Sequence, residues 1–246
     1  MTFSYFYRNY LDLTDVVNVA VSAADYSPIT ITNPLDGAPF TIYSQSAASI
    51  GRVQNVLLNS DALRQWYHGV EATVDRRFRN NLTLFGGITV GSSKAATSAS
   101  NNPSDRINTS GYDLLDSTVI ANFSGVYRLP WNVDISSHGA YYTGQPLRRI
   151  YTITPALVPA LRQTSQDVNL VSAGEVRKPN QTLIDLRVGR RFRAAGSMTF
   201  EPLFEVYNIL NENASLVEVE QVGATLGRIS RNIDGRMVRL GLKVSF

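Results

Sequence analysis

The last twelve residues decide the fold class: Gly235-Arg236-Met237-Val238-Arg239-Leu240-Gly241-Leu242-Lys243-Val244-Ser245-Phe246. From Val238 onward every second residue is apolar, and the residues between them are basic or small. Successive side chains of a β-strand point to opposite faces, so this alternation predicts a strand with one apolar face and one polar face. A helix would scatter the apolar residues around its axis, which argues against that alternative.

The same period of two recurs along the chain and predicts eight strands: 3–10, 67–78, 82–90, 118–129, 133–143, 182–192, 197–208 and 235–246. Several of them are longer than the ~5–6 residues usual for soluble strands. They match the ~9–11 residues that a tilted strand needs to cross a bilayer. Strand length therefore favours membrane-spanning strands over a soluble β-sandwich.

The predicted connections alternate between short and long. The short ones are Arg79-Asn80-Asn81, Pro130-Trp131-Asn132 and Arg193-Ala194-Ala195-Gly196, and the long ones are roughly 11–66, 91–117, 144–181 and 209–235. Outer-membrane barrels have short periplasmic turns and long extracellular loops, whereas a sandwich has no reason to place every long loop at one end. The sequence thus predicts an all-β fold: a segment of an antiparallel transmembrane β-barrel. Residues 40–43 and 149–154 are expected to extend the barrel above the membrane or to fold as hairpins within the loops.

This topology also gives the strands a direction, with the final strand running from the outside to the periplasm. Aromatic residues then gather near both ends of the strands. The predicted periplasmic set is Phe78, Tyr127, Trp131, Phe192, Phe200 and Phe246, and the predicted outer set is Tyr10, Trp66, Tyr67, Tyr141 and Tyr142. Aromatic girdles at the two membrane interfaces are typical of such barrels.

The two faces of the strands predict two environments. The apolar faces should contact outer-membrane lipid, and the polar faces should line the lumen. The predicted lumen-facing residues are Glu71, Asp75, Arg77, Arg128, Asp185, Arg187, Arg191, Glu201, Glu205, Arg239 and Lys243. We expect these charges to be solvated and to pair across strands. The long loops are better candidates for ligand recognition, but no residue in them identifies a ligand.

Composition excludes several classes of function. Charged residues make up 17% of the chain, below the ~25% usual for soluble domains, and the net charge of +3 is scattered rather than clustered, so no nucleic-acid partner is expected. The absence of cysteine excludes disulfides, thiolate metal sites and a cysteine nucleophile. His68 and His138 have no partner at metal-ligand spacing. We predict no catalytic residue, no metal site, no cofactor and no enzyme activity.

Several stretches together resemble a known family. Val206-Tyr207-Asn208-Ile209-Leu210-Asn211, followed by a long loop and the terminal strand, resembles the end of a TonB-dependent outer-membrane receptor. The stretches Tyr67-His68-Gly69-Val70-Glu71, Tyr127-Arg128-Leu129-Pro130-Trp131, Thr143-Gly144-Gln145-Pro146 and Leu183-Ile184-Asp185-Leu186-Arg187 are similar to the Oar-like branch. The resemblance implies a receptor for TonB-driven uptake of a ligand across the outer membrane of a Gram-negative bacterium.

The resemblance also implies further chain and partners. Such receptors have a signal peptide, a TonB box, a plug domain and a barrel of about 22 strands. The sequence begins MTFSYFYRNYLDL, without signal-peptide features. Residues 1–246 are therefore interpreted as the C-terminal portion of a receptor barrel. Its expected partners are membrane lipid, the rest of the barrel, the plug and, through the N-terminal part, TonB.

The end of the chain resembles an assembly signal. Phe246 follows Leu240, Leu242 and Val244 on one apolar face, a pattern similar to the terminal signal read by the barrel-assembly machinery. One alternative function stays open: a self-contained eight-stranded outer-membrane barrel acting as an anchor or adhesin. Eight strands can close, but side chains then just fill the interior, and the many predicted lumen charges disfavour this arrangement.

Overall fold

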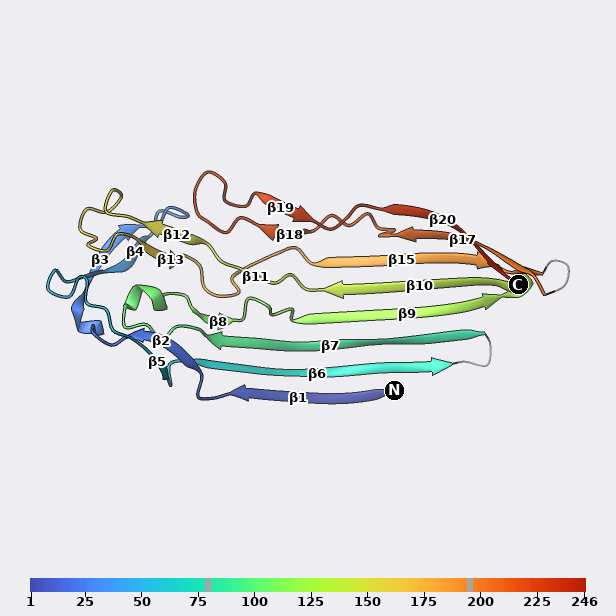
Figure 1. Ribbon diagram of the computed structural model, residues 1–246, viewed down its shortest axis with the longest axis horizontal. Coiled ribbons are helices and arrows are strands. Elements are labelled where there is room, and N and C mark those ends of the chain that lie inside the picture. Colours follow the sequence, from blue (N-terminus) through green and yellow to red (C-terminus); the bar gives the residue numbers. More distant parts are fainter. Residues whose placement is uncertain (78–80, 194–196) are drawn as a thin grey trace.

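The computed structural model describes residues 1–77, 81–193 and 197–246, and a large antiparallel sheet forms its body (Figure 1). Its long strands lie in the order β1 (Thr2–Tyr10), β6 (Arg64–Arg77), β7 (Leu82–Ala96), β9 (Val119–Leu129), β10 (Val133–Tyr142), β15 (Gln181–Arg190), β17 (Thr199–Tyr207) and β20 (Met237–Ser245). Each pairs with the long strand before or after it in the chain, which makes an up-and-down meander. All eight predicted strands, and the antiparallel all-β fold class, are confirmed.

The sheet is open in the part of the chain that the structure describes. There β1 pairs only with β6, and β20 pairs only with β17. Figure 1 places β1 and β20 at opposite sides of the sheet. An edge strand carries a row of unpaired backbone N–H and C=O groups, so each of these edges is able to receive another strand.

Two predicted strands are longer than the alternation indicated. β6 begins at Arg64 and β7 continues to Ala96, and these extensions pair with each other. A short strand, β8 (Ser110–Tyr112), pairs with the end of β7. The prediction stopped early because the last residues of β7, Gly-Ser-Ser-Lys-Ala-Ala, are small or polar on both faces and give no alternating signal.

One predicted strand is interrupted. β15 ends at Arg190, and a two-residue strand, β16 (Phe192–Arg193), continues in the same register against β17. The gap lies opposite Glu201 and Pro202 of β17. Proline has no backbone N–H to donate to a ladder, which explains the break in pairing here.

The ends of the sheet differ as predicted. At one end the turn η3 (Pro130–Asn132) joins β9 to β10, with Trp131 and Asn132 in the left-handed region at φ 64° and 57°. Figure 1 shows the C-terminus at this end and the long connections at the other. The predicted turns 79–81 and 193–196 lie partly outside the described residues. Phe78, of the predicted periplasmic aromatic set, also lies outside them. Tyr10 and Tyr142 end their strands on the loop side, where the outer aromatic set was expected.

The long connections contain most of the remaining secondary structure. Loop 1 (11–63) holds β2 (Thr14–Asn18), η1 (Ala23–Asp25), β3 (Tyr26–Thr32), β4 (Pro39–Gln45) and β5 (Asn55–Asn59); loop 2 (97–118) holds η2 (Pro103–Arg106) and β8; loop 3 (143–180) holds β11 (Pro146–Leu147), β12 (Ile150–Ile153), β13 (Gln166–Asn169) and β14 (Val176–Arg177); loop 4 (208–236) holds β18 (Ser215–Glu218) and β19 (Ile229–Asn232). The pairs β3–β4 and β12–β13 are antiparallel hairpins. The expected excursions at 40–43 and 149–154 are therefore confirmed as parts of hairpins.

The hydrophobic core lies among these loops and not on the sheet. A cluster of buried side chains joins loop 1 to loop 3: Ile42, Ile153, Leu161, Val168 and Leu170. Of the 13 buried hydrophobic residues in the described part of the chain, all but Ala95 and Val206 lie in loops. The apolar face of the sheet is left open, with Leu240 and Leu242 of β20 78% and 63% exposed.

Candidate functional site

Strand register gathers the predicted lumen-facing charges on one face of the sheet. Residues directly opposite each other on paired strands point to the same side. Asp75 pairs with Phe85, and that row continues through Ser124 and His138 to Asp185. Other rows of opposite residues, two positions apart along the strands, lie on the same face. They include the remaining predicted charges of the long strands: Glu71, Arg77, Arg128, Arg187, Glu201, Glu205, Arg239 and Lys243. Arg191, in the gap between β15 and β16, joins them through an ion pair with Glu201.

The opposite face is apolar over the same strands. Its rows include Val188 opposite Phe204, which in turn lies opposite Leu240. Val244 lies opposite Phe200, which lies opposite Phe192 on β16. The sheet thus has one charged face and one apolar face, as the alternation predicted.

An ion-pair network occupies the charged face of the last three long strands. Two glutamates of β17 are shared among three arginines: Arg187–Glu201 (3.7 Å), Arg187–Glu205 (3.8 Å), Arg191–Glu201 (3.5 Å) and Arg239–Glu205 (3.3 Å). Lys243 lies opposite Glu201 in register. The glutamate side chains are largely covered and the guanidinium groups are about half exposed. Exposed ion pairs each contribute about 0–1 kcal/mol, so we expect each pair of this network to add only a little to the stability of the sheet.

A second ion pair stands beside the Pro130–Asn132 turn. Arg128 donates to both carboxylate oxygens of Asp134, from Nε at 2.7 Å and from Nη2 at 3.2 Å. On β6, Glu71 accepts a hydrogen bond from Thr89 (3.4 Å). Within the described residues, Asp75 and Arg77 form no ion pair, so the pairing expected for the lumen charges is concentrated toward the C-terminal strands.

Sequence reasoning missed a polar contact in the middle of the same face. Ser124 Oγ and His138 Nδ1 are 2.8 Å apart, and Asp185 lies directly opposite His138. Oδ1 of Asp185 accepts the backbone N–H of Asn208 at 2.8 Å. That bond ties β15 to the end of β17, so the structure gives Asp185 a positioning role. In the described residues, no group of three or more His, Cys, Asp or Glu side chains is arranged to hold a metal ion.

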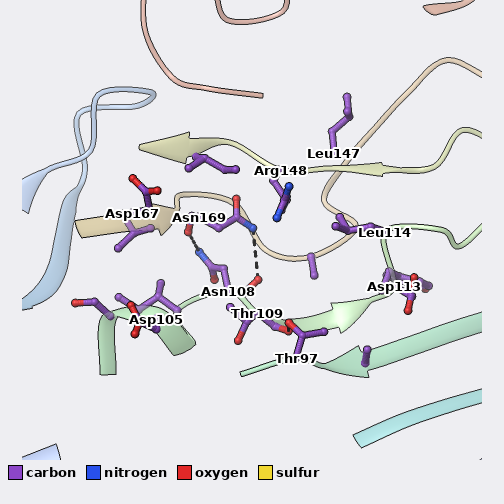
Figure 2. Close-up of a pocket in the computed structure, with 17 residues that line it drawn as sticks. Thr97, Asp105, Asn108, Thr109, Asp113, Leu114, Leu147, Arg148, Asp167 and Asn169 are labelled. Carbon is purple, nitrogen blue, oxygen red and sulfur yellow. Dashed lines mark hydrogen bonds between the residues drawn. The ribbon is translucent and has the colours of Figure 1, made fainter. Parts of the chain in front are cut away.

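A cavity of about 380 Å³ lies between loop 2 and loop 3 (Figure 2). Residues from β7, η2 and β8 form one wall, and residues from β11 to β13 and the segment after them form the other. Asn108 and Asn169 join the walls: Asn108 Nδ2 donates to Asn169 O (2.7 Å), and Asn169 Nδ2 donates to Asn108 O (3.4 Å). No sequence motif indicated this cavity, because its two walls are far apart in the chain.

Comparisons with known proteins support the fold. No protein family and no curated protein matches the sequence. Among solved structures, the chain is similar to the outer membrane transporter YddB from Escherichia coli, with a TM-score of 0.50 and 11% identity over 98% of this chain. It is also similar to the siderophore receptor PirA from Acinetobacter baumannii, with a TM-score of 0.49 and 13% identity over 99% of this chain. The chain spans 29% of the length of each of these proteins.

The chain therefore has the fold of part of an outer-membrane β-barrel. The resemblance to outer-membrane receptors and the predicted outer-membrane location agree with the likeness to YddB, an outer membrane transporter. Identity this low carries the fold and nothing finer. In the described part of the chain, no helix is long and apolar enough to cross a membrane.

Proposed function

We propose that this chain is the C-terminal portion of the barrel of an outer-membrane receptor for TonB-driven uptake of a ligand. One observation carries the proposal: strand register places the charged residues on one face of a long-stranded sheet whose other face is apolar. That division suits a wall between lipid and an aqueous lumen. The location of all four long loops at one end supports the same function.

The open edges of the sheet suggest its immediate partners. The unpaired sides of β1 and β20 suit pairing with further strands of the same barrel, because closure removes edges that otherwise promote aggregation. In the proposed receptor, the plug contacts the charged face, and TonB acts indirectly through the N-terminal part. The apolar face contacts outer-membrane lipid.

Expression of residues 1–246 alone, compared with the whole receptor, tests this assignment. Folded outer-membrane barrels migrate differently on gels before and after heating. We expect a heat-sensitive band from the whole receptor and none from residues 1–246, whose edges have no partners. A folded, heat-sensitive species from residues 1–246 alone would favour the self-contained eight-stranded anchor or adhesin instead.

Growth on single nutrients at limiting concentration tests TonB-driven uptake. A strain lacking the receptor gene and a strain lacking TonB should share a growth defect on the transported nutrient. The double deletion should be no worse than the TonB deletion on that nutrient, because both losses block one route. Additive defects, or no shared defect, would contradict the uptake function without affecting the barrel assignment.

We also propose that the apolar face of β20 and the final aromatic residue form the signal read by the barrel-assembly machinery. Leu240, Leu242, Val244 and Phe246 alternate along one face, and Phe246 is 89% exposed. Deleting Phe246 should reduce the amount of receptor assembled in the membrane, whereas Phe246→Tyr should retain it. If assembly is unchanged by the deletion, Phe246 is only a lipid-facing aromatic.

A further inference from the structure

The cavity between loops 2 and 3 has a floor suited to an apolar group. Ala95, Leu147 and Val168 are buried there, 6%, 3% and 3% exposed. Tyr112 also lines the cavity, and the cationic groups of Lys94 and Arg177 lie 5.1 Å and 4.7 Å from its ring centre. Small-molecule sites usually measure about 300–1,000 Å³ and have apolar linings with a few placed polar groups. The volume of about 380 Å³ falls at the small end of that range.

Four side-chain hydrogen-bond donors of the cavity wall, on Thr97, Thr109, Asn108 and Asn169, are already in use. The hydroxyl groups of Thr97 and Thr109 donate to the backbone oxygens of Thr109 and Arg106. The side-chain amides of Asn108 and Asn169 donate across the two walls, as Figure 2 shows. Arg148 is the remaining cation of the wall, and its Nε is paired with Glu220 at 3.1 Å. The neutral amide and hydroxyl donors that join the two walls are therefore committed to the protein, and the Nη groups of Arg148 are the main charged donors left at the cavity.

Acceptors, in contrast, remain available. Oδ1 of Asn108 receives no hydrogen bond from any described residue. Asp113 accepts one bond on each carboxylate oxygen, from Leu115 N (2.8 Å) and Gln65 Nε2 (3.2 Å), which leaves further lone pairs. Asp105 and Asp167 add two more carboxylates to the lining. The nearby arginines Arg148 and Arg177 are paired with Glu220 and Asp116. The three lining carboxylates therefore outnumber the one other nearby cation, Lys94, and give the cavity an excess of negative charge.

We propose that this cavity binds a small ligand with an apolar body and a primary ammonium group. An ammonium group has three donors and no acceptor, which suits the carboxylate and amide oxygens left available on this wall. The apolar body would cover Ala95, Leu147 and Val168, and the ammonium would bond to Asn108 Oδ1 and Asp113. This proposal rests on the proposed receptor function in one respect, that the ligand reaches the cavity from outside the cell. Binding itself is measurable whether or not the protein takes part in uptake.

Three probes of nearly equal shape separate charge from burial: phenethylamine, 2-phenylethanol and 3-phenylpropionate. Each is titrated into the methyl-labelled whole receptor in maltoside micelles, and the methyl signals of Ala95 and Leu147 report binding. Dispersed signals from Ile42 and Ile153 establish that the loops are folded in each sample. We expect saturable shifts with phenethylamine, binding of the alcohol weaker by about tenfold, and no binding of the carboxylate. Equal binding of the alcohol or the carboxylate, or no response to the amine, would overturn the proposal.

Two neighbouring leucines provide matched variants. Leu114 lines the cavity and is 40% exposed, whereas Leu115 does not line it and is 79% exposed. Leu114→Lys should weaken phenethylamine binding about fivefold and Leu114→Glu should strengthen it by a similar factor, since a charge at the rim acts directly on the ammonium. Leu115→Lys should have a smaller effect because of greater distance and screening. Equal effects at the two positions, or the same sign for Lys and Glu at Leu114, would place the ammonium elsewhere.

Discussion

The long-stranded sheet and the loops at its outer end are stabilised in different ways. The sheet has regular ladders but leaves the apolar residues of β20 exposed, and its two edge strands are unpaired within the described residues. The loops have less regular pairing but enclose the core cluster around Ile42 and Ile153, both 0% exposed. The apolar face and the edges of the sheet therefore need a covering, which lipid and neighbouring strands would supply in the proposed receptor, whereas the loops bury apolar surface among themselves.

This difference divides the expected functions. A wall whose register is fixed by cross-strand pairs suits a rigid barrel, and a separately packed loop cluster suits a rigid ligand site above it. We therefore expect substitutions in the loop core to destabilise the loops alone. The effect of a substitution on the sheet should depend on which face the new side chain occupies.

The largest effect is expected in the loop core. Ile42→Ala should lower the free energy of opening of the loop cluster by about 2–5 kcal/mol, because it removes a fully buried side chain and leaves a cavity. Amide hydrogen exchange in β3, β4, β12 and β13 measures this. Leu57→Ala, in the same loop but 66% exposed, is the matched control and should change exchange by less than about 0.5 kcal/mol. Equal loss of protection in β9 and β10 would indicate that loops and sheet unfold together.

Neighbouring residues on opposite faces of β20 should respond differently to a charge. Leu240→Arg places a guanidinium on the apolar face, where it should cost about 2–4 kcal/mol in a membrane. Gly241→Arg places it on the charged face, where the nearest atoms to an added Cβ are those of Leu203 at 3.6 and 3.7 Å, an ordinary contact distance. In a urea titration of the membrane-embedded protein, Gly241→Arg should lower the free energy of unfolding much less than Leu240→Arg does. The reverse order would mean that the two faces have been assigned the wrong way round.

A smaller effect is expected in the ion-pair network. Glu205→Gln removes the carboxylate shared by Arg187 and Arg239 and should cost about 1 kcal/mol, measured by the same titration. Asp75→Asn is the control, since Asp75 lies on the same face without an ion pair in the described residues. Similar losses in the two variants would show that the network contributes nothing beyond ordinary surface charge.

The smallest effect concerns pH in the loops. Partial burial, and then the charges of Asp105 and Asp25, raise the pKa of Tyr26 above its usual 10.0. The unfolded chain loses this proton first as pH rises, so the contribution to loop stability is present below pH 10 and is lost as pH climbs through the folded pKa. Loop opening measured at pH 9 and pH 11 should show this loss, and Tyr26→Phe should remove it. An identical change in the Phe variant would assign the pH dependence to other groups.

The sheet was predictable because its two faces meet different environments. Where one face of a strand is apolar and the other is polar, as from Val238 to Phe246, local alternation identifies the strand. Where this contrast between the faces ends, as beyond Val90 in β7, the predicted strand stopped although the strand continues to Ala96. The sequence also contains Pro202, but local patterns do not predict which residue of the neighbouring strand lies opposite it. The interruption between β15 and β16 therefore could not be predicted.

The loop core and the cavity were not predictable in the same way. Ile42 packs near Ile153 and Val168 although more than a hundred residues separate them in the chain, so no local pattern marks the contact. The cavity joins Asn108 to Asn169 for the same reason. The charged face was predictable as a set of residues, but the concentration of ion pairs at Glu201 and Glu205 follows from the register of β15, β17 and β20.

Labelling of single cysteines on whole cells tests most directly whether this sheet spans the outer membrane with its loops outside. Residues 1–246 contain no cysteine, so each variant has one reactive position within this part of the receptor. A maleimide on a polyethylene glycol chain too large for the outer membrane should label Leu57→Cys, in loop 1, on intact cells. It should label Trp131→Cys, in the β9–β10 turn, only after the outer membrane is disrupted. Labelling of Trp131→Cys on intact cells, or protection of Leu57→Cys until disruption, would contradict this topology.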